Sequence, residues 1–262
     1  MKTKHILTLF AGIVSWGITA QTTQTREVSS FNKIDASGAP TIIYRQSDTL
    51  SLSVEGNTEA LNNIETRVSD NTLFIKSTGK VSGPYKIRIS GNTLNNISVS
   101  GATNFKTNGA LRTDSMVIES SGASNVNMEL NTKAVKAIVS GASDVTLSGS
   151  NSNLYADISG ASNFKAYKLL SSKVDVTSSG ASTAKVYAAE KLHANATGAS
   201  TVKFKGEPKE VSAEGSSSSQ IVKIAADDSQ KKVTGKDSAS TSFNWGNKKI
   251  IIADEMCIRD RS

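Results

Sequence analysis

Apolar and polar residues alternate with a period of two along most of the chain between residues 97 and 204. This is the period of a β-strand, because successive side chains of a strand point to opposite faces. The alternation is interrupted about every 19 residues by the motif Ser-Gly-Ala-Ser or a near copy, called the box below. The pattern therefore predicts two short strands between successive boxes, each with one face turned inward.

The inward positions lie two and four residues before each box glycine, and four and six residues after it. Those before the glycine are Ile97, Val99, Ile118, Ser120, Ala137, Val139, Ala156, Ile158, Val176, Ser178, Ala194 and Ala196. Those after it are Phe105, Thr107, Val126, Met128, Val145, Leu147, Phe164, Ala166, Ala184, Val186, Val202 and Phe204. These columns predict one continuous, largely apolar interior.

The repetition itself predicts the architecture. The box glycines are 21, 19, 19, 20 and 18 residues apart, and they are Gly101, Gly122, Gly141, Gly160, Gly180 and Gly198. Self-similarity at a short fixed period is typical of a solenoid, in which one unit is stacked many times. The sequence thus predicts an all-β, single-domain parallel β-helix (solenoid) with about 19 residues per coil in the central repeats.

The composition of the box indicates a structural turn. Glycine can take a positive φ at a sharp corner without penalty, and the serines can hydrogen-bond the turn backbone. The alanine is expected to fill the inside of the corner. Box serines could instead be nucleophiles, but a nucleophile needs a base beside it, and six copies of one motif favour architecture.

The chain divides into four parts. Residues 1–20 have the pattern of a signal peptide, residues 21–30 that of a polar linker, residues 31–252 that of the solenoid, and residues 253–262 form a tail that breaks the pattern. Short alternating runs at 41–45, 50–54 and 72–76, and the box echo at Gly38, place the N-terminal third in the same solenoid, with longer coils and looser turns.

The N-terminus resembles an export signal. Lys2 and Lys4 precede an uncharged, mostly apolar run over residues 6–18, and Ala20 offers a small residue for cleavage. The run is shorter than the roughly 20 residues that span a bilayer, although a retained anchor is the alternative. We therefore expect an exported protein of the periplasm or cell surface with no transmembrane segment in the mature chain. Cys257 is the one cysteine, so no intramolecular disulfide can form.

The net charge of the chain does not point to a further class of partner. With 30 Lys and Arg against 23 Asp and Glu, the formal net charge is +7, spread along the chain. A nucleic-acid binder concentrates basic residues together with aromatic residues for base stacking, and the chain lacks that combination. Nucleic acid is therefore not an expected partner.

One outward column is a candidate binding site. Five residues after the box glycines, the side chains are Lys106, Asn127, Thr146, Lys165, Lys185 and Lys203. The last three lie on consecutive coils, about 5 Å apart, which is the spacing of neighbouring strands. Like charges so close repel, so the column could serve an anionic partner such as an acidic glycan. The alternative is a solvated face that discourages aggregation.

Catalytic and metal chemistry has weaker support. Asp157 and Asp175 are outward on successive coils, with backbones roughly 8 Å apart, a separation compatible with an inverting glycosidase. No other signal supports catalysis, so no catalytic residue is assigned. The residue after each box is aspartate only at Asp144, which is no calcium-ligand ladder. No metal site and no cofactor are expected.

With these features the chain resembles the auto-transporter adhesin, head GIN domain family of exported Bacteroidota proteins. The resemblance rests on the leader, the opening Phe31-Asn32-Lys33-Ile34-Asp35-Ala36-Ser37-Gly38, the serial boxes and the ending Asn244-Trp245-Gly246. It implies a β-helical fold in the cell envelope, and it brings no catalytic residues. The expected function is a non-catalytic adhesion or binding module, with a surface glycan or an envelope protein as partner. A carbohydrate-active enzyme on a β-helix scaffold and a purely structural envelope protein are the alternatives.

Overall fold

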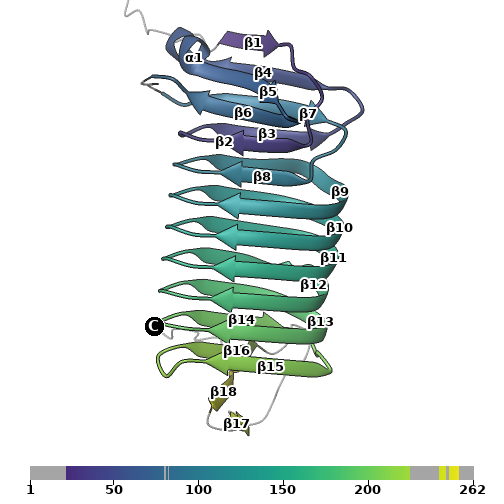
Figure 1. Ribbon diagram of the computed structural model, residues 1–262, viewed down its shortest axis with the longest axis vertical. Coiled ribbons are helices and arrows are strands. Elements are labelled where there is room, and N and C mark those ends of the chain that lie inside the picture. Colours follow the sequence, from purple (N-terminus) through teal and green to yellow (C-terminus); the bar gives the residue numbers. More distant parts are fainter. Residues whose placement is uncertain (1–21, 80, 82, 225–241, 246–247, 254–262) are drawn as a thin grey trace, which may run out of the picture.

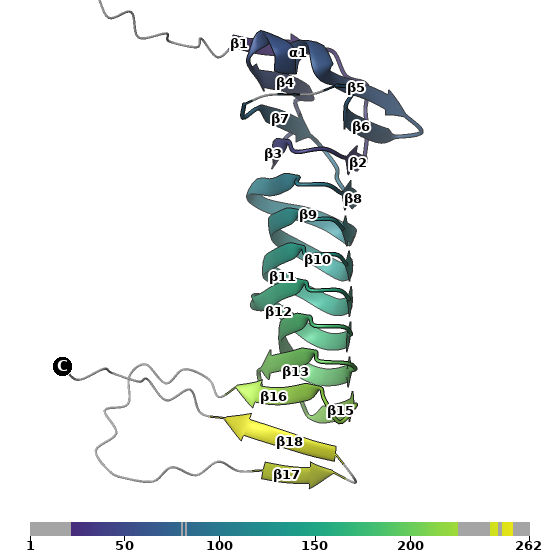
Figure 2. The ribbon, with the colours of Figure 1, turned by 90° about the vertical axis from the view of Figure 1, so that its left-hand side faces the viewer.

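The computed structural model describes residues 22–79, 81, 83–224, 242–245 and 248–253. Its central part is a stack of coils of about 19 residues each (Figure 1), so the predicted β-solenoid is confirmed. Turned by 90°, the stack is a narrow column with the coils one above another (Figure 2). The central strands are β9 (Asn104–Ser120), β10 (Asn125–Val139), β11 (Asp144–Ile158), β12 (Asn163–Ser178) and β13 (Thr183–Ala196).

Each central coil is one long strand and not the expected two short strands. Neighbouring coils pair in parallel on both sides of the bend in the strand, and between β10 and β11 the pairing also continues through the bend itself, where Leu130 faces Gly149 and Asn131 faces Ser150. Backbone groups at this bend therefore keep their partners on the next coil, which removes any need for a loop between two strands. The box turn is what separates one strand from the next.

Two features of the box turn require glycine. All six box glycines have φ between +68° and +75°, a region that other L-residues rarely occupy. A Cβ on any of them would also lie 2.4 to 2.9 Å from the carbonyl oxygen of the box glycine on the preceding coil. That oxygen accepts a hydrogen bond of 2.7 to 2.9 Å from the amide of the next box alanine, so the turns stack as closely as the strands do.

The box alanine is exposed, which corrects the expectation that it fills the inside of the corner. The last box residue turns inward instead, because glycine and alanine together make the corner. In four of the six boxes its hydroxyl donates to the carbonyl three residues earlier, as in Ser143 Oγ to Ser140 O at 2.7 Å; in the other two it donates to a carbonyl of the preceding coil. Neighbouring coils also bond directly, with Ser124 Oγ and Ser143 Oγ 3.3 Å apart. These inward residues are at most 1% exposed: Thr103, Ser124, Ser143, Ser162, Ser182 and Ser200.

The predicted inward columns form the core. All of their members are buried except Thr107, which is partly exposed. The exception has a local cause, because β9 contains a bulge. The register with β10 jumps from Lys106 opposite Asn127 to Ala110 opposite Glu129. The Thr107 hydroxyl is used there as the acceptor of the Glu129 amide, at 3.0 Å.

The N-terminal third belongs to the same sheet but does not form successive coils. Strands β2 and β3 stack directly on β8 and β9. In the box echo, the carbonyl oxygen of Gly38 accepts a hydrogen bond of 2.7 Å from the Ala102 amide. On the other side of this coil, β6 pairs in parallel with β2 and β7 with β3, and antiparallel pairs join β1 with β4, β4 with β7 and β5 with β6 (Figure 1). The elements are β1 (Thr22–Arg26), β2 (Lys33–Ala36), β3 (Thr41–Gln46), β4 (Ser51–Gly56), α1 (Thr58–Asn63), β5 (Ile64–Ser69), β6 (Thr72–Ser77), β7 (Lys86–Gly91) and β8 (Asn96–Val99).

The segment expected to be a polar linker, 21–30, contains β1. This strand covers the edge of β4, which would otherwise be a free sheet edge. Arg26 then fastens β1 to the neighbouring segment, because its guanidinium donates to Leu61 O at 2.7 Å and Ile64 O at 2.5 Å. The polar residues of this segment are those of an exposed edge strand.

The last strands are shorter, although Thr201 faces Gln220 and the 19-residue repeat is kept. They are β14 (Thr201–Lys205), β15 (Glu210–Gly215) and β16 (Gln220–Ile224), followed by the hairpin of β17 (Ser242–Trp245) and β18 (Lys248–Ala253). Strand β18 pairs in parallel with β16. The leader (residues 1–20) and the tail beyond residue 253 lie outside the described residues. Within the described part of the chain, no helix has the length and apolar character needed to cross a membrane.

Candidate functional site

The lysine column is in register. Lys165 on β12 is the direct strand partner of Lys185 on β13, which is in turn the partner of Lys203 on β14. Lys106 belongs to the same column but lies three coils away, because Asn127 and Thr146 occupy the coils between. The structure therefore brings three of the four candidate lysines together and leaves Lys106 apart.

A hollow of about 400 Å³ lies along these three lysines, and we call it the lysine pocket. Its other wall is the outward column two residues earlier in each strand. The lining side chains thus provide ammonium, hydroxyl and amide groups: Asn163, Lys165, Thr183, Lys185, Thr201, Lys203 and Gln220. Every one of these side chains can donate a hydrogen bond, and none is acidic.

The three lysines differ in their charge partners. Lys165 Nζ lies 2.7 Å from Asp144 Oδ1, which comes from the coil above and from the neighbouring column. In the described part of the chain, no carboxylate lies within ion-pair distance of Lys185 or Lys203. If their ammonium groups stay about 5 Å apart, as their strands do, they repel by about 1 kcal/mol in water. An anion between them would remove that repulsion.

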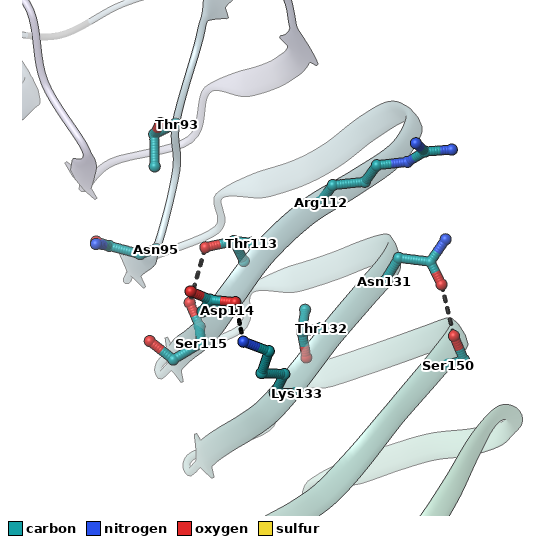
Figure 3. A pocket seen from close by; sticks show the side chains of 10 residues that line it. All are labelled: Thr93, Asn95, Arg112, Thr113, Asp114, Ser115, Asn131, Thr132, Lys133 and Ser150. Atoms are coloured by element: carbon teal, nitrogen blue, oxygen red, sulfur yellow. Dashed lines mark hydrogen bonds and ion pairs between the residues drawn. The ribbon is translucent and has the colours of Figure 1, made fainter.

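A second hollow, of about 820 Å³, lies where the coils bend, and we call it the corner groove. Its floor is formed by Thr113 and Thr132, and Asp114 and Lys133 lie along one side (Figure 3). The other side carries Arg112, Asn131 and Ser150. The Asp114 and Lys133 side chains form an ion pair with Oδ1 and Nζ 2.9 Å apart, and Ser150 Oγ donates to Asn131 Oδ1 at 2.5 Å.

Sequence reasoning did not find the corner groove. It depends on where each strand bends, and the box pattern carries no information about that position. The one sequence signal was the 21-residue spacing from Gly101 to Gly122, which indicated an irregular coil without locating the irregularity.

The two aspartates considered for catalysis lie as expected on adjacent strands with an offset of two residues. Asp157 faces Thr177, and Asp175 faces Tyr155, an outward side chain that is 53% exposed. No group of three or more His, Cys, Asp or Glu side chains suited to a metal ion occurs among the described residues. Asp144, the one acidic member of its column, is the ion-pair partner of Lys165.

Comparison with known proteins places the chain in a family. The family model described as "Putative auto-transporter adhesin, head GIN domain" matches residues 30–208, and the chain belongs to this family. A putative adhesin from Bacteroides fragilis is 30% identical, with a TM-score of 0.74 over 78% of this chain and 97% of that chain. No curated protein matches the chain with significant similarity.

Two further solved structures share the fold. A putative lipid binding protein from Parabacteroides distasonis is 19% identical, with a TM-score of 0.63 over 78% of this chain and 96% of that chain. A putative adhesin from Parabacteroides merdae is 18% identical, with a TM-score of 0.61 over 79% of this chain and 97% of that chain. The family and the B. fragilis protein are described as adhesins and not as enzymes.

Proposed function

We propose that this protein is an exported, non-catalytic adhesion module of the cell envelope that binds anionic glycans in the lysine pocket. The observation that carries the proposal is the pairing of Lys185 and Lys203 on consecutive coils with no carboxylate partner in the described chain. Membership of a family described as adhesins supports a binding role. The leader at residues 1–20 supports export.

The chemistry of the pocket suits a carboxylate or sulfate on a sugar. The two free ammonium groups supply charge, and Thr183 and Thr201 supply hydroxyl donors beside them. Asn163 and Gln220 at the two ends can bond the sugar hydroxyls that flank the anionic group. A ladder of coils also repeats the same donors along the solenoid axis, as a polymeric ligand with repeated charges requires.

Anionic lipid headgroups carry the same charge, so the test must separate them from glycans. The purified chain 21–254 is applied to an array of acidic and neutral glycans, and separately to vesicles of phosphatidylcholine with phosphatidylglycerol. We expect capture of acidic glycans that weakens as salt is raised, because salt screens exposed charges. Binding to the vesicles alone would overturn the glycan assignment.

The variant that tests the pocket is Lys185→Ser with Lys203→Ser. Its matched control is Lys136→Ser with Lys173→Ser, which removes the same charge from exposed lysines on the other half of the coils. We expect the pocket variant to lose at least tenfold in affinity for acidic glycans and the control to keep it. Equal losses in the two variants would mean that net charge and not the pocket causes binding.

A further inference from the structure

We propose that the corner groove is a second binding site, and that it takes a hydroxyl-rich, uncharged oligosaccharide. The site is separate from the lysine pocket, since its lining residues come from the other end of the stack. They belong to the segment before β8 and to β9, β10 and β11, whereas the lysine pocket lies on β12, β13, β14 and β16.

The shape of the groove suits a short chain of sugars. It crosses successive coils from Thr93 and Asn95 to Ser150 (Figure 3), along the axis of the solenoid. Three steps between neighbouring strands make a length of about 14 Å. The hollow of about 820 Å³ is open to solvent, so a sugar chain would lie along the surface with one side in water.

The lining chemistry selects the ligand class. Hydroxyl, amide, carboxylate and ammonium groups lie side by side, so the groove offers both donors and acceptors to the hydroxyl groups of a sugar. None of the lining side chains is aromatic or a long aliphatic chain, which disfavours a lipid acyl chain. Within the groove, Lys133 is already balanced by Asp114, which leaves Arg112 as a single unbalanced charge and makes the lining less suited to a polyanion than the lysine pocket.

The Asp114–Lys133 pair is better suited to a ligand than to stability. Its side chains are 83% and 78% exposed, and an ion pair so open to solvent contributes little to folding. Both groups keep free hydrogen-bonding capacity above the threonine floor, where a sugar hydroxyl can accept from Lys133 and donate to Asp114. Binding there exchanges water for ligand without leaving a buried charge unpaired.

The groove is also held in place before any ligand arrives. The Gln46 side chain bridges β3 to the groove, donating from Nε2 to Arg112 O at 3.0 Å and accepting from the Arg112 amide at 2.8 Å. The floor hydroxyls of Thr113 and Thr132 both bond the carbonyl two residues ahead, each at 3.2 Å. Such preorganisation reduces the entropy that binding must overcome.

The lower limit of the groove has a structural cause. The floor column of Thr113 and Thr132 continues to Asn151 and Ser171 on the next two coils. These two side chains turn inside, where they are 6% and 1% exposed and bond each other. The floor therefore ends at Thr132 on β10, and the site accommodates a short segment of glycan.

The test uses the chain 21–254 on an array of neutral oligosaccharides at about 0.5 M salt, where exposed charges are largely screened. The groove variant is Asp114→Ala with Asn131→Ala, both exposed positions. The matched control, Asp157→Ala with Asn195→Ala, removes the same side-chain types from another surface of the stack. We expect capture of at least one neutral oligosaccharide, weakened tenfold or more in the groove variant and unchanged in the control.

Two results would overturn the proposal: no capture of any neutral oligosaccharide under these conditions, or equal capture by the groove variant and the unchanged chain. The variant Lys185→Ser with Lys203→Ser is measured on the same array. We expect it to keep neutral capture, and loss of that capture would show that the two sites are not separate. Failure of acidic-glycan binding would leave this proposal standing, because the ligands, salt and residues differ.

Discussion

Replacing one box glycine should disrupt the stacking of two coils, and Gly141→Ala is the sharpest case. Gly141 has a φ of +75°, and an added Cβ would lie 2.5 Å from Gly122 O. That atom belongs to the backbone of the coil above and cannot move away cheaply. It also accepts the Ala142 amide at 2.7 Å, so any displacement weakens a hydrogen bond between the coils.

The expected loss has two parts. The left-handed conformation costs an alanine about 1 to 2 kcal/mol. Moving the Gly122 carbonyl weakens its bond from Ala142 and strains the two flanking bonds of the turn, at about 1 kcal/mol for each bond lost. The sum is about 3 to 5 kcal/mol, which is large for a single substitution.

Gly109→Ala is the matched control. Gly109 has a φ of +93°, but a Cβ there has no heavy atom within 4 Å. It should therefore lose only the conformational part, about 1 to 2 kcal/mol. The difference between the two variants isolates the contact between coils, which we expect to be about 2 to 3 kcal/mol.

Thermal and urea unfolding of the chain 21–254, followed by far-UV circular dichroism, measures the difference. Hydrogen exchange at the Ala142 amide adds a local measurement, and we expect faster exchange in Gly141→Ala than in Gly109→Ala. Equal stability of the two variants would refute the reasoning, because the close approach of the coils would then have no energetic weight.

Three further predictions concern the pocket and the core. Asp144→Asn removes the partner of Lys165 and should tighten binding of acidic glycans several-fold by calorimetry; unchanged affinity would mean that Lys165 does not contact the ligand. Burial raises the pKa of Tyr44 to about 12, against about 10 in the unfolded chain. The contribution of the neutral Tyr44 phenol to the free energy of unfolding is therefore complete below pH 10. It is lost as pH rises from 10 through 12, by up to about 3 kcal/mol. Urea midpoints between pH 9 and 12 should fall more steeply for the unchanged chain than for Tyr44→Phe, and parallel curves would contradict this. Asn151 Nδ2 is buried without a hydrogen-bond partner in the described chain. The double variant Asn151→Leu with Ser171→Ala should therefore be neutral or stabilising by about 1 kcal/mol in urea unfolding. A clear loss of stability would reveal an unrecognised partner of Asn151.

The solenoid was predictable because its information is local. Period two and a box every 19 or so residues fix both the coil length and the inward columns, and strand partners lie one repeat away. The N-terminal arrangement was not predictable, because Gly38 stacks on Gly101 across a 63-residue excursion. Nothing in the alternating run at 50–54 shows that it forms an antiparallel strand, whereas the similar run at 72–76 also pairs in parallel as part of a coil.

The candidate site shows the same limit. The register of Lys165, Lys185 and Lys203 followed from the repeat, and the structure places them side by side. The ion pair of Lys165 with Asp144 could not be predicted from the repeat, because the two residues belong to different columns on different coils. The corner groove escaped prediction because it arises from the bend of the strands, where side chains of several coils meet.

The lysine pocket is tested most directly by the affinity for an acidic glycan, measured by calorimetry at low and raised salt, for the unchanged chain and for Lys185→Ser with Lys203→Ser. We predict binding that weakens with salt in the unchanged chain and an affinity at least tenfold lower in the variant at low salt. Affinity that is the same in both chains would contradict the assignment of the lysine pocket as the binding site.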